Sequence, residues 1–202
     1  MHMELLSAQP SPFARKVRVL VHESGLADEV KIIEVATTPI DTDLLVAKAN
    51  PLGKIPALVI PDMRPIYDSR VICRYLDCYA KAGLYPEDRL WETLTVEATA
   101  DGVMDAAVLM TYERRIRPEN MVSETWLDAQ WAKIARAVES IDMSEMFMPD
   151  QPLGMGHIGI GCALAYLDFR HGDRNWRDGN ERLEEWFELF SQRDSMKATA
   201  PE

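Results

Sequence analysis

The stretch Asn50-Pro51-Leu52-Gly53-Lys54-Ile55-Pro56-Ala57-Leu58 decides how the first part of this chain can fold. Its two prolines and its glycine are incompatible with a helix. The apolar run at 57–60 ends at Pro61-Asp62, which predicts a short buried strand. Pro56 would start this strand. A cis bond before Pro56 would turn the Ile55 backbone outward as an edge to which an extended peptide can add, whereas a trans bond would give an ordinary loop.

Strands and helices are predicted on both sides of this stretch. Ser11 is a preferred N-cap residue and Pro12 suits the first position of a helix, which then ends at Gly25. Asp68-Ser69 begins another helix in the same way. The elements together predict a small α/β sheet, in which a parallel pair joined by a helix is followed by an antiparallel pair. The expected strands are 4–8, 30–35, 57–60 and an edge strand at 64–67, and 37–49 is expected to be a polar loop with room for one helical turn.

The pattern changes at Gly83-Leu84-Tyr85-Pro86, and the remainder of the chain is helical in character. We therefore divide the chain into an α/β domain at 1–82, a linker at 83–88 and an all-α helical bundle at 89–202. The segment 157–169 is apolar on every side, as expected for a helix at the centre of a bundle. The other predicted helices are a long one that ends near Arg117-Pro118, one at 123–143 and one around 183–190, and a loop is expected at 149–156.

Composition narrows the class of protein. Of the 202 residues, 47% are apolar, as in a globular protein, and a net charge of −11 argues against binding to nucleic acid. No apolar run approaches the roughly 20 residues that span a bilayer. The first residues do not resemble a signal peptide, so we expect a cytoplasmic protein. The three cysteines match no zinc spacing and no disulfide framework, so we expect no metal and three small buried side chains.

Three motifs in order and spacing resemble those of the glutathione transferase superfamily. They are Ser11-Pro12-Phe13-x-x-Lys16, the stretch at 50–58 and Asp68-Ser69, and an all-helical second half follows them. The chain looks most like cytosolic-type bacterial members with Ser-Pro-Phe at the active site. This resemblance covers nearly the whole chain. It implies a thioredoxin-like N-terminal domain, an all-helical C-terminal domain, a homodimer, and glutathione as co-substrate with a small apolar electrophile as its partner.

The resemblance also assigns roles to individual residues. Ser11 is the catalytic residue, and Asp101 matches a region that in some members reaches glutathione in the partner subunit. The family divides by the residue at the Ser11 position, and this chain has no cysteine before Cys73 and no tyrosine before Tyr67. The glutathione-binding residues are Phe13, Lys54, Ile55, Pro56, Asp68 and Ser69, and the electrophile pocket draws on Phe13, Met104, Val108 and Met110.

The chemistry expected of Ser11 follows from general principles. A free thiol has a pKa near 8.5, so about a few per cent of it is ionised at neutral pH. A hydroxyl that donates a hydrogen bond to the sulfur anion stabilises it by about 1.5–3 kcal/mol, which lowers the thiol pKa by roughly one or two units. The helix N-terminus beside Ser11 acts in the same direction. The alternative is that Ser11 only caps its helix.

Three functions fit these residues. The first is conjugation of glutathione to small electrophiles. The second is a non-enzymatic binding or regulatory protein of the same fold, and the third is a glutathione-dependent isomerase or peroxidase, which needs the same thiolate. One departure from the family pattern is also visible: its central helix usually begins with Ser or Thr followed three residues later by Asp, whereas His157-Ile158-Gly159-Ile160 contains no acid. Two alternatives remain for this helix: His157 caps it instead, or its end is satisfied by another group.

Overall fold

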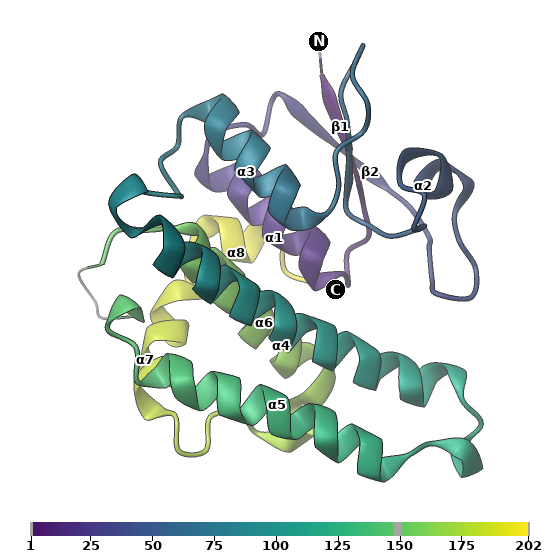
Figure 1. Cartoon of the computed structure of the whole chain (residues 1–202), viewed down its shortest axis with the longest axis vertical. Coiled ribbons are helices and arrows are strands. Elements are labelled where there is room, and N and C mark those ends of the chain that lie inside the picture. Colours follow the sequence, from purple (N-terminus) through teal and green to yellow (C-terminus); the bar gives the residue numbers. More distant parts are fainter. Residues whose placement is uncertain (1, 148–150, 202) are drawn as a thin grey trace. The chain divides into compact units, whose positions relative to one another are not determined.

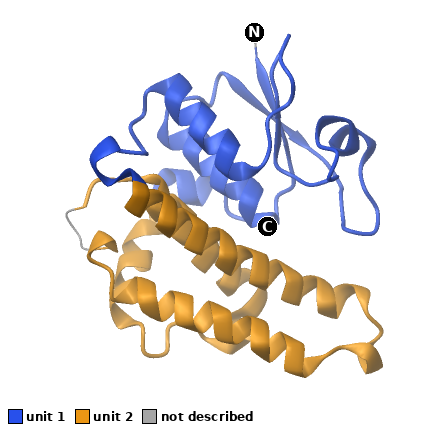
Figure 2. Cartoon of the chain, viewed as in Figure 1, with its two compact units in different colours: residues 1–90, 193–202 blue, residues 91–192 orange. Residues whose placement is uncertain are grey.

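The computed structural model describes residues 2–147 and 151–201, and the chain forms two compact units (Figure 2). Unit 1 comprises residues 1–90 and 193–202, and unit 2 comprises residues 91–192. The sequence had placed the last ten residues with the helical bundle. The structure groups them with unit 1 because their side chains bond to the first helix of that unit.

Unit 1 contains a sheet of three strands, β1 (Met3–Ser7), β2 (Val30–Glu34) and β3 (Ala57–Val59), in the order β2-β1-β3. β1 runs parallel to β2 and antiparallel to β3. The predicted edge strand at 64–67 is reduced to a single bridge between Ile66 and Leu58. Its proline, Pro65, has no N–H with which to extend a ladder.

Helices cover both faces of this sheet, as in a thioredoxin-like domain. Figure 1 shows α1 (Pro12–Glu23) and α3 (Ser69–Ala80) side by side on one face and α2 (Leu44–Ala49) on the other. Side chains alternate along β1, so Leu5 and Leu6 point to opposite faces, and Leu6 packs with the helix α2. Asp43 caps α2, which makes it a defined helix of the expected length.

The helix α8 (Asp194–Ala198) was not predicted. Two α1 side chains bond to it and its flanking residues. The Arg15 guanidinium donates to the Met196 carbonyl at 3.0 Å and to Thr199 Oγ1 at 3.3 Å. At the other end of α1, Glu23 forms a two-pronged ion pair with Arg193, at 2.7 and 2.8 Å. These contacts join residues more than 160 positions apart, so local sequence patterns cannot reveal them.

Unit 2 is built from α4 (Leu90–Ile116), α5 (Glu124–Asp142), α6 (Met155–His171) and α7 (Glu181–Phe190). Helix α6 is buried along most of its length, as its composition predicted. A side chain at Gly161 would collide with the Phe190 ring, so the glycine permits close packing of α6 against α7. Among the described helices, none combines the length and the apolarity that a bilayer crossing requires. Short 3-10 helices lie at Glu87–Arg89, Glu119–Met121, Glu145–Phe147 and Gly172–Arg174.

The start of α6 differs from the expected position. Residues 149 and 150 of the predicted loop 149–156 lie outside the described residues. The helix is capped at Gly154, so the capping segment is 154–157 and not 157–160. His157 is therefore not the N-cap residue but the third residue of the helix, and its side chain reaches back to the cap. Its Nδ1 accepts the Gly154 N–H at 3.0 Å, and its Nε2 lies 2.8 Å from the Met146 carbonyl. A carbonyl only accepts, so Nε2 carries the proton, and a neutral imidazole replaces the usual acid.

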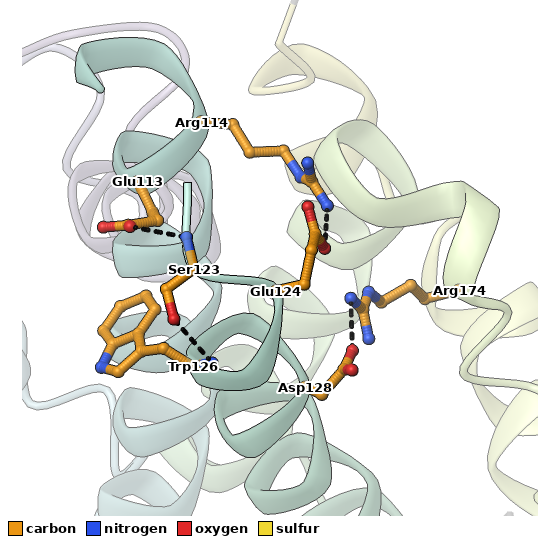
Figure 3. Close-up of polar contacts among 7 residues, drawn as sticks. All are labelled: Glu113, Arg114, Ser123, Glu124, Trp126, Asp128 and Arg174. Carbon is orange, nitrogen blue, oxygen red and sulfur yellow. Dashed lines mark hydrogen bonds and ion pairs between the residues drawn. The ribbon is translucent and has the colours of Figure 1, made fainter. Parts of the chain in front are cut away.

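Polar contacts brace the hairpin between α4 and α5 (Figure 3). Arg114 pairs with Glu124 at 2.8 Å, and Glu113 accepts the Ser123 N–H at 3.3 Å. Ser123 caps α5 by accepting the Trp126 N–H at 3.3 Å. The charged partners are largely exposed, so they set the geometry of the turn more than they add stability.

A buried histidine joins α4 to α6. His171 Nε2 lies 2.9 Å from the Ala107 carbonyl and 3.3 Å from Thr111 Oγ1, and the carbonyl again requires the proton on Nε2. Burial lowers the pKa of His171, although the bond to Ala107 acts in the opposite direction. The folded protein therefore resists protonation of this ring.

We expect stability to depend on pH through His171. The unfolded ring has a pKa of about 6.5, and the folded ring has a lower one. The free energy of unfolding should therefore be constant above about pH 6.5 and decline below it, because the unfolded chain binds the extra proton. His171→Gln keeps a donor for the Ala107 carbonyl but cannot titrate, so its free energy of unfolding should decline less below about pH 6.5. Urea midpoints between about pH 5 and 8 for both proteins test it, and parallel curves would contradict it.

Candidate functional site

Ser11 is the N-cap of α1, immediately after the turn that follows β1. Its side-chain oxygen accepts the Ala14 N–H at 3.3 Å, and its backbone carbonyl accepts the Arg15 N–H. The side chain is half-buried. A serine hydroxyl has two lone pairs and one proton, so a cap uses a lone pair and leaves the O–H free to donate. Capping and donation to a ligand are therefore compatible at Ser11.

The loop before β3 is held by the buried side chain of Asn50. Its amide donates to the Lys54 carbonyl at 2.8 Å, and its oxygen accepts the Leu52 N–H at 3.0 Å. Gly53 completes the turn with a φ of +65°, in the region that favours glycine. A Cβ at Gly53 would lie 2.7 Å from Thr42 Cγ2, so the position excludes a side chain for space as well.

The Ile55–Pro56 peptide bond is cis, as one of the two sequence interpretations required. Pro56 is buried and Ile55 is half-buried beside it. Among the described residues, no hydrogen bond uses the Ile55 N–H or C=O. Ile55 therefore presents a backbone donor and acceptor to which a peptide-like ligand can pair. The side chain of the neighbouring Lys54 is exposed.

Asp68 and Ser69 form the N-terminus of α3. The Asp68 carboxylate accepts the Arg70 N–H at 3.0 Å and pairs with the Arg70 guanidinium at 3.2 Å. Burial opposes ionisation of Asp68, but the bonds and charge of Arg70 outweigh it, and the pKa of Asp68 is lowered. Asp68 is thus an anion at neutral pH. Ser69, at the first helical position, is only 3% exposed.

The strand register brings these three segments to one end of the sheet. β1 and β3 are antiparallel, with Leu6 opposite Ala57, so the turn that leads to Ser11 lies beside the residues just before Ala57. Ile66 bridges to Leu58 in the opposite direction, so the chain advances from Ile66 to Asp68 toward the same end. One site therefore receives a hydroxyl, an extended backbone edge, a carboxylate and two helix N-termini, which together suit a short anionic peptide.

Comparison with known proteins agrees with this geometry. Residues 10–78 match the glutathione S-transferase N-terminal domain, and residues 124–189 match the glutathione S-transferase C-terminal domain. The uncharacterized GST-like protein YibF of Escherichia coli is 35% identical, with 98% of each chain covered. The chain belongs to the glutathione S-transferase family.

Solved structures of bacterial glutathione S-transferases are similar over the full length. A family member from Pseudomonas fluorescens Pf-5 with bound glutathione is 40% identical, with 99% of each chain covered and a TM-score of 0.95. A glutathione S-transferase from Methylobacillus flagellatus with glutathione bound is 35% identical and has a TM-score of 0.86. The match covers 99% of the present chain and 100% of the Methylobacillus chain. The expected fold, a thioredoxin-like domain followed by a helical domain, is thereby confirmed.

The remaining predicted site residues of this glutathione S-transferase lie on two helices. Phe13 is half-buried in the first turn of α1, two residues after Ser11. On α4, Asp101, Met104 and Val108 share a face by their spacing of three and four. Met110 is six residues beyond Met104, about 240° around the helix, so it cannot share that face. Met104, Met110 and Asp101 are buried, at 0%, 2% and 6% exposure.

Sequence reasoning missed the side chains that support the site. Asn50 was part of the quoted stretch, but its two bonds to the loop were not anticipated. Arg15 and Arg18 of α1 are buried, whereas arginines are usually exposed. In the sequence, the burial of Arg15 and Arg18 was indicated only by their position three residues apart on a helix whose other residues are mostly apolar.

The cysteines differ from expectation at one position. Cys73 and Cys162 are buried, but Cys78 is exposed. Five residues along α3 from Cys73, it points about 140° away from it, and therefore to the outside. Among the described residues, no group of three or more histidine, cysteine, aspartate or glutamate side chains could hold a metal ion.

We expect Gly53→Ala to be more destabilising than its backbone angle alone implies. Gly25 provides the control, because its φ is +71° and nothing lies within 4 Å of a Cβ built there. Gly25→Ala should cost about 1–2 kcal/mol of unfolding free energy for the left-handed conformation, and Gly53→Ala about 1–3 kcal/mol more for the contact with Thr42.

Adding Thr42→Ala to Gly53→Ala should recover only the unfolding free energy that is lost through the contact with Thr42, and not the cost of the left-handed conformation. Urea unfolding of wild type, Gly53→Ala, Thr42→Ala and the double variant closes the cycle, and Gly25→Ala is measured beside them as the control. Equal losses at Gly25 and Gly53 would show that the loop moves away from Thr42 at no cost, and would remove the packing constraint on this turn.

Proposed function

We propose that this glutathione S-transferase binds glutathione in unit 1, holds its sulfur as a thiolate at Ser11 and transfers it to a small apolar electrophile. The observation that carries the proposal is the half-buried Ser11 hydroxyl, which caps α1 and keeps a proton to donate. The relatives from Pseudomonas fluorescens and Methylobacillus flagellatus hold bound glutathione, which supports the same ligand here.

The Ser11 hydroxyl acts by stabilising charge. Its O–H donates to the sulfur anion, and the N-terminus of α1 adds a positive dipole end. Thiolate is then the main form of the bound thiol near pH 7. Its sulfur forms a bond to an electrophilic carbon, and either a leaving group departs from that carbon with its electron pair or a proton from solvent completes an addition. Ser11 forms no bond to the substrate.

The other predicted residues would hold the three parts of glutathione. The Ile55 backbone, preceding cis Pro56, pairs with the cysteinyl part. The ionised Asp68 accepts from the γ-glutamyl ammonium, and the Ser69 hydroxyl and N–H at the start of α3 bind the γ-glutamyl carboxylate. The exposed Lys54 reaches the glycyl carboxylate.

The electrophile and the second subunit complete the proposal. The residues proposed to contact the electrophile are Phe13 in unit 1 and, in unit 2, Met104 and Val108 on one face of α4; methionine is a soft, adaptable side chain. The helical geometry favours these two over Met110. We further propose a cytoplasmic homodimer that acts in detoxification. The burial of Asp101 weighs against its reaching glutathione in the partner, because it would first have to leave the interior.

We expect Ser11→Ala to abolish most conjugation while glutathione still binds. A calorimetric titration gives the dissociation constant, and the ultraviolet band of the thiolate near about 240 nm reports ionisation on the same samples. Losing the hydrogen bond should raise the pKa of the bound thiol by about one to two units. An unchanged thiolate band in Ser11→Ala would remove Ser11 from the mechanism.

Ser123→Ala is the matched control for the lost cap. Ser123 caps α5 with the same 3.3 Å bond to the third N–H of its helix, but it belongs to unit 2. Both variants should lose about 1 kcal/mol of stability, and only Ser11→Ala should lose the thiolate. If wild type binds no glutathione at millimolar concentration, a non-enzymatic binding role replaces the proposal. If the thiolate forms but an aryl halide does not react, assays with an organic peroxide and a cis-enone test the other enzymatic roles.

We expect Asp68→Asn and Ser69→Ala to weaken glutathione binding without changing the thiol pKa. Asn keeps an acceptor for the Arg70 N–H, so Asp68→Asn removes the charge but not the helix cap. A lost bond to a charged ligand group should raise the dissociation constant about tenfold or more. Arg70→Gln is the control, since it removes the partner of Asp68 and should leave binding intact or tighter. A normal constant in either test variant would exclude that residue from the site.

A further inference from the structure

The turn that precedes Ser11 is held by a buried arginine of the same helix. Arg18 lies on the second turn of α1 and is 7% exposed. Its Nη2 donates to the carbonyl of Gln9 at 3.0 Å, outside the helix and two residues before Ser11. Side chains of a helix lean toward its N-terminus, which is why a residue seven positions after Ser11 can reach back to this turn.

The Gln9 carbonyl controls the placement of Ser11. The residue between them is Pro10, whose ring fixes its φ, so one soft dihedral angle separates the anchored peptide from the backbone of Ser11. A hydrogen bond from the Ser11 N–H to the Ala8 carbonyl, at 3.0 Å, closes the same turn. A third bond, from the Ala14 N–H to Ser11 Oγ, is the one that holds the side-chain oxygen itself.

We propose that Arg18 is a positioning residue for the thiol site, which sets the direction of the Ser11 O–H through the Gln9 carbonyl. This inference rests on the proposed role of Ser11. Hydrogen bonds weaken steeply with misalignment, so a turn freed from Arg18 would leave Ser11 in the cap but donating poorly to sulfur. Arg18 itself need not touch glutathione.

Arg15 offers a control on the same helix. It is also buried, at 6% exposure, and its Nη2 also donates to a backbone carbonyl at 3.0 Å. Its acceptor is Met196 in the C-terminal segment, not the turn before Ser11. Replacing Arg15 therefore removes one buried guanidinium, its bond to Met196 and its bond to Thr199 Oγ1, while leaving the Gln9 carbonyl anchored.

The test is the pKa of glutathione bound to the full-length chain, read from the thiolate band in Arg18→Met, Arg18→Lys and Arg15→Met. Arg18→Met should raise this pKa by about one unit and lower kcat about tenfold at pH 6.5 with little change in KM. Arg18→Lys keeps a charge and a donor and should lie between Arg18→Met and wild type. Arg15→Met should match wild type in the pKa of the bound thiol, whatever its stability.

Each outcome separates the inference from the proposed function. If wild type lowers the thiol pKa and Arg18→Met does so equally, Arg18 does not position Ser11. An equal rise in Arg15→Met would show general loosening or loss of positive charge, and would also overturn the inference. If Arg18→Met does not fold, Arg18→Lys decides by the same comparison with wild type. If glutathione bound to the wild-type protein keeps the pKa of the free thiol, the proposed role of Ser11 is wrong, and the inference about Arg18 is then wrong with it.

Discussion

The pairing of β1 with β3 is the constraint on which the rest of unit 1 depends. Leu6 opposite Ala57 in an antiparallel ladder places the end of one strand beside the start of the other. A shift of one residue would turn Leu5 and Leu6 to the wrong faces and separate them from the helices that cover them. The register that buries the core therefore also assembles the site.

Both site helices begin at the end of the sheet that this register selects. α1 starts after the turn that leaves β1, and α3 starts after the bridge from Ile66 to Leu58. Their first N–H groups have no partners within their own helices. The side chains of Ser11 and Asp68 accept the N–H groups of Ala14 and Arg70, and a helix N-terminus favours an anionic ligand. The electrostatic character of the site thus follows from backbone dipoles even though the chain carries a net charge of −11.

What could be predicted from sequence was the local chemistry. The caps at Ser11 and Asp68, the absence of a helix at 50–56 and the strand after Pro56 each depend on a few adjacent residues whose conformational preferences are strong. The interactions that escaped prediction join distant parts of the chain, such as Arg15 with Thr199 and the α8 segment. The bond from Arg18 to Gln9 spans only nine positions, but it depends on which face of α1 is buried.

The start of α6 also depends on a contact with another part of the chain that the local sequence does not reveal. The sequence pointed to His157 as one group that could satisfy the start of this helix, but it placed the cap at 157, three residues later than Gly154. Periodicity gives the apolar body of a helix, while its first residue depends on the partner that the cap finds. His157 is also hydrogen-bonded to the Met146 carbonyl, which lies on a separate segment of the chain.

Serine is suited to position 11 because capping and thiolate stabilisation make different demands on one group. Aspartate and asparagine cap a helix as well as serine does, but aspartate has no proton to donate when ionised and would repel the sulfur anion. A cysteine could react but would cap poorly. A hydroxyl accepts through a lone pair and donates through its proton at the same time. The helix that needs a cap and the thiolate that needs a donor can therefore share Ser11, provided that the turn before it holds the O–H in line.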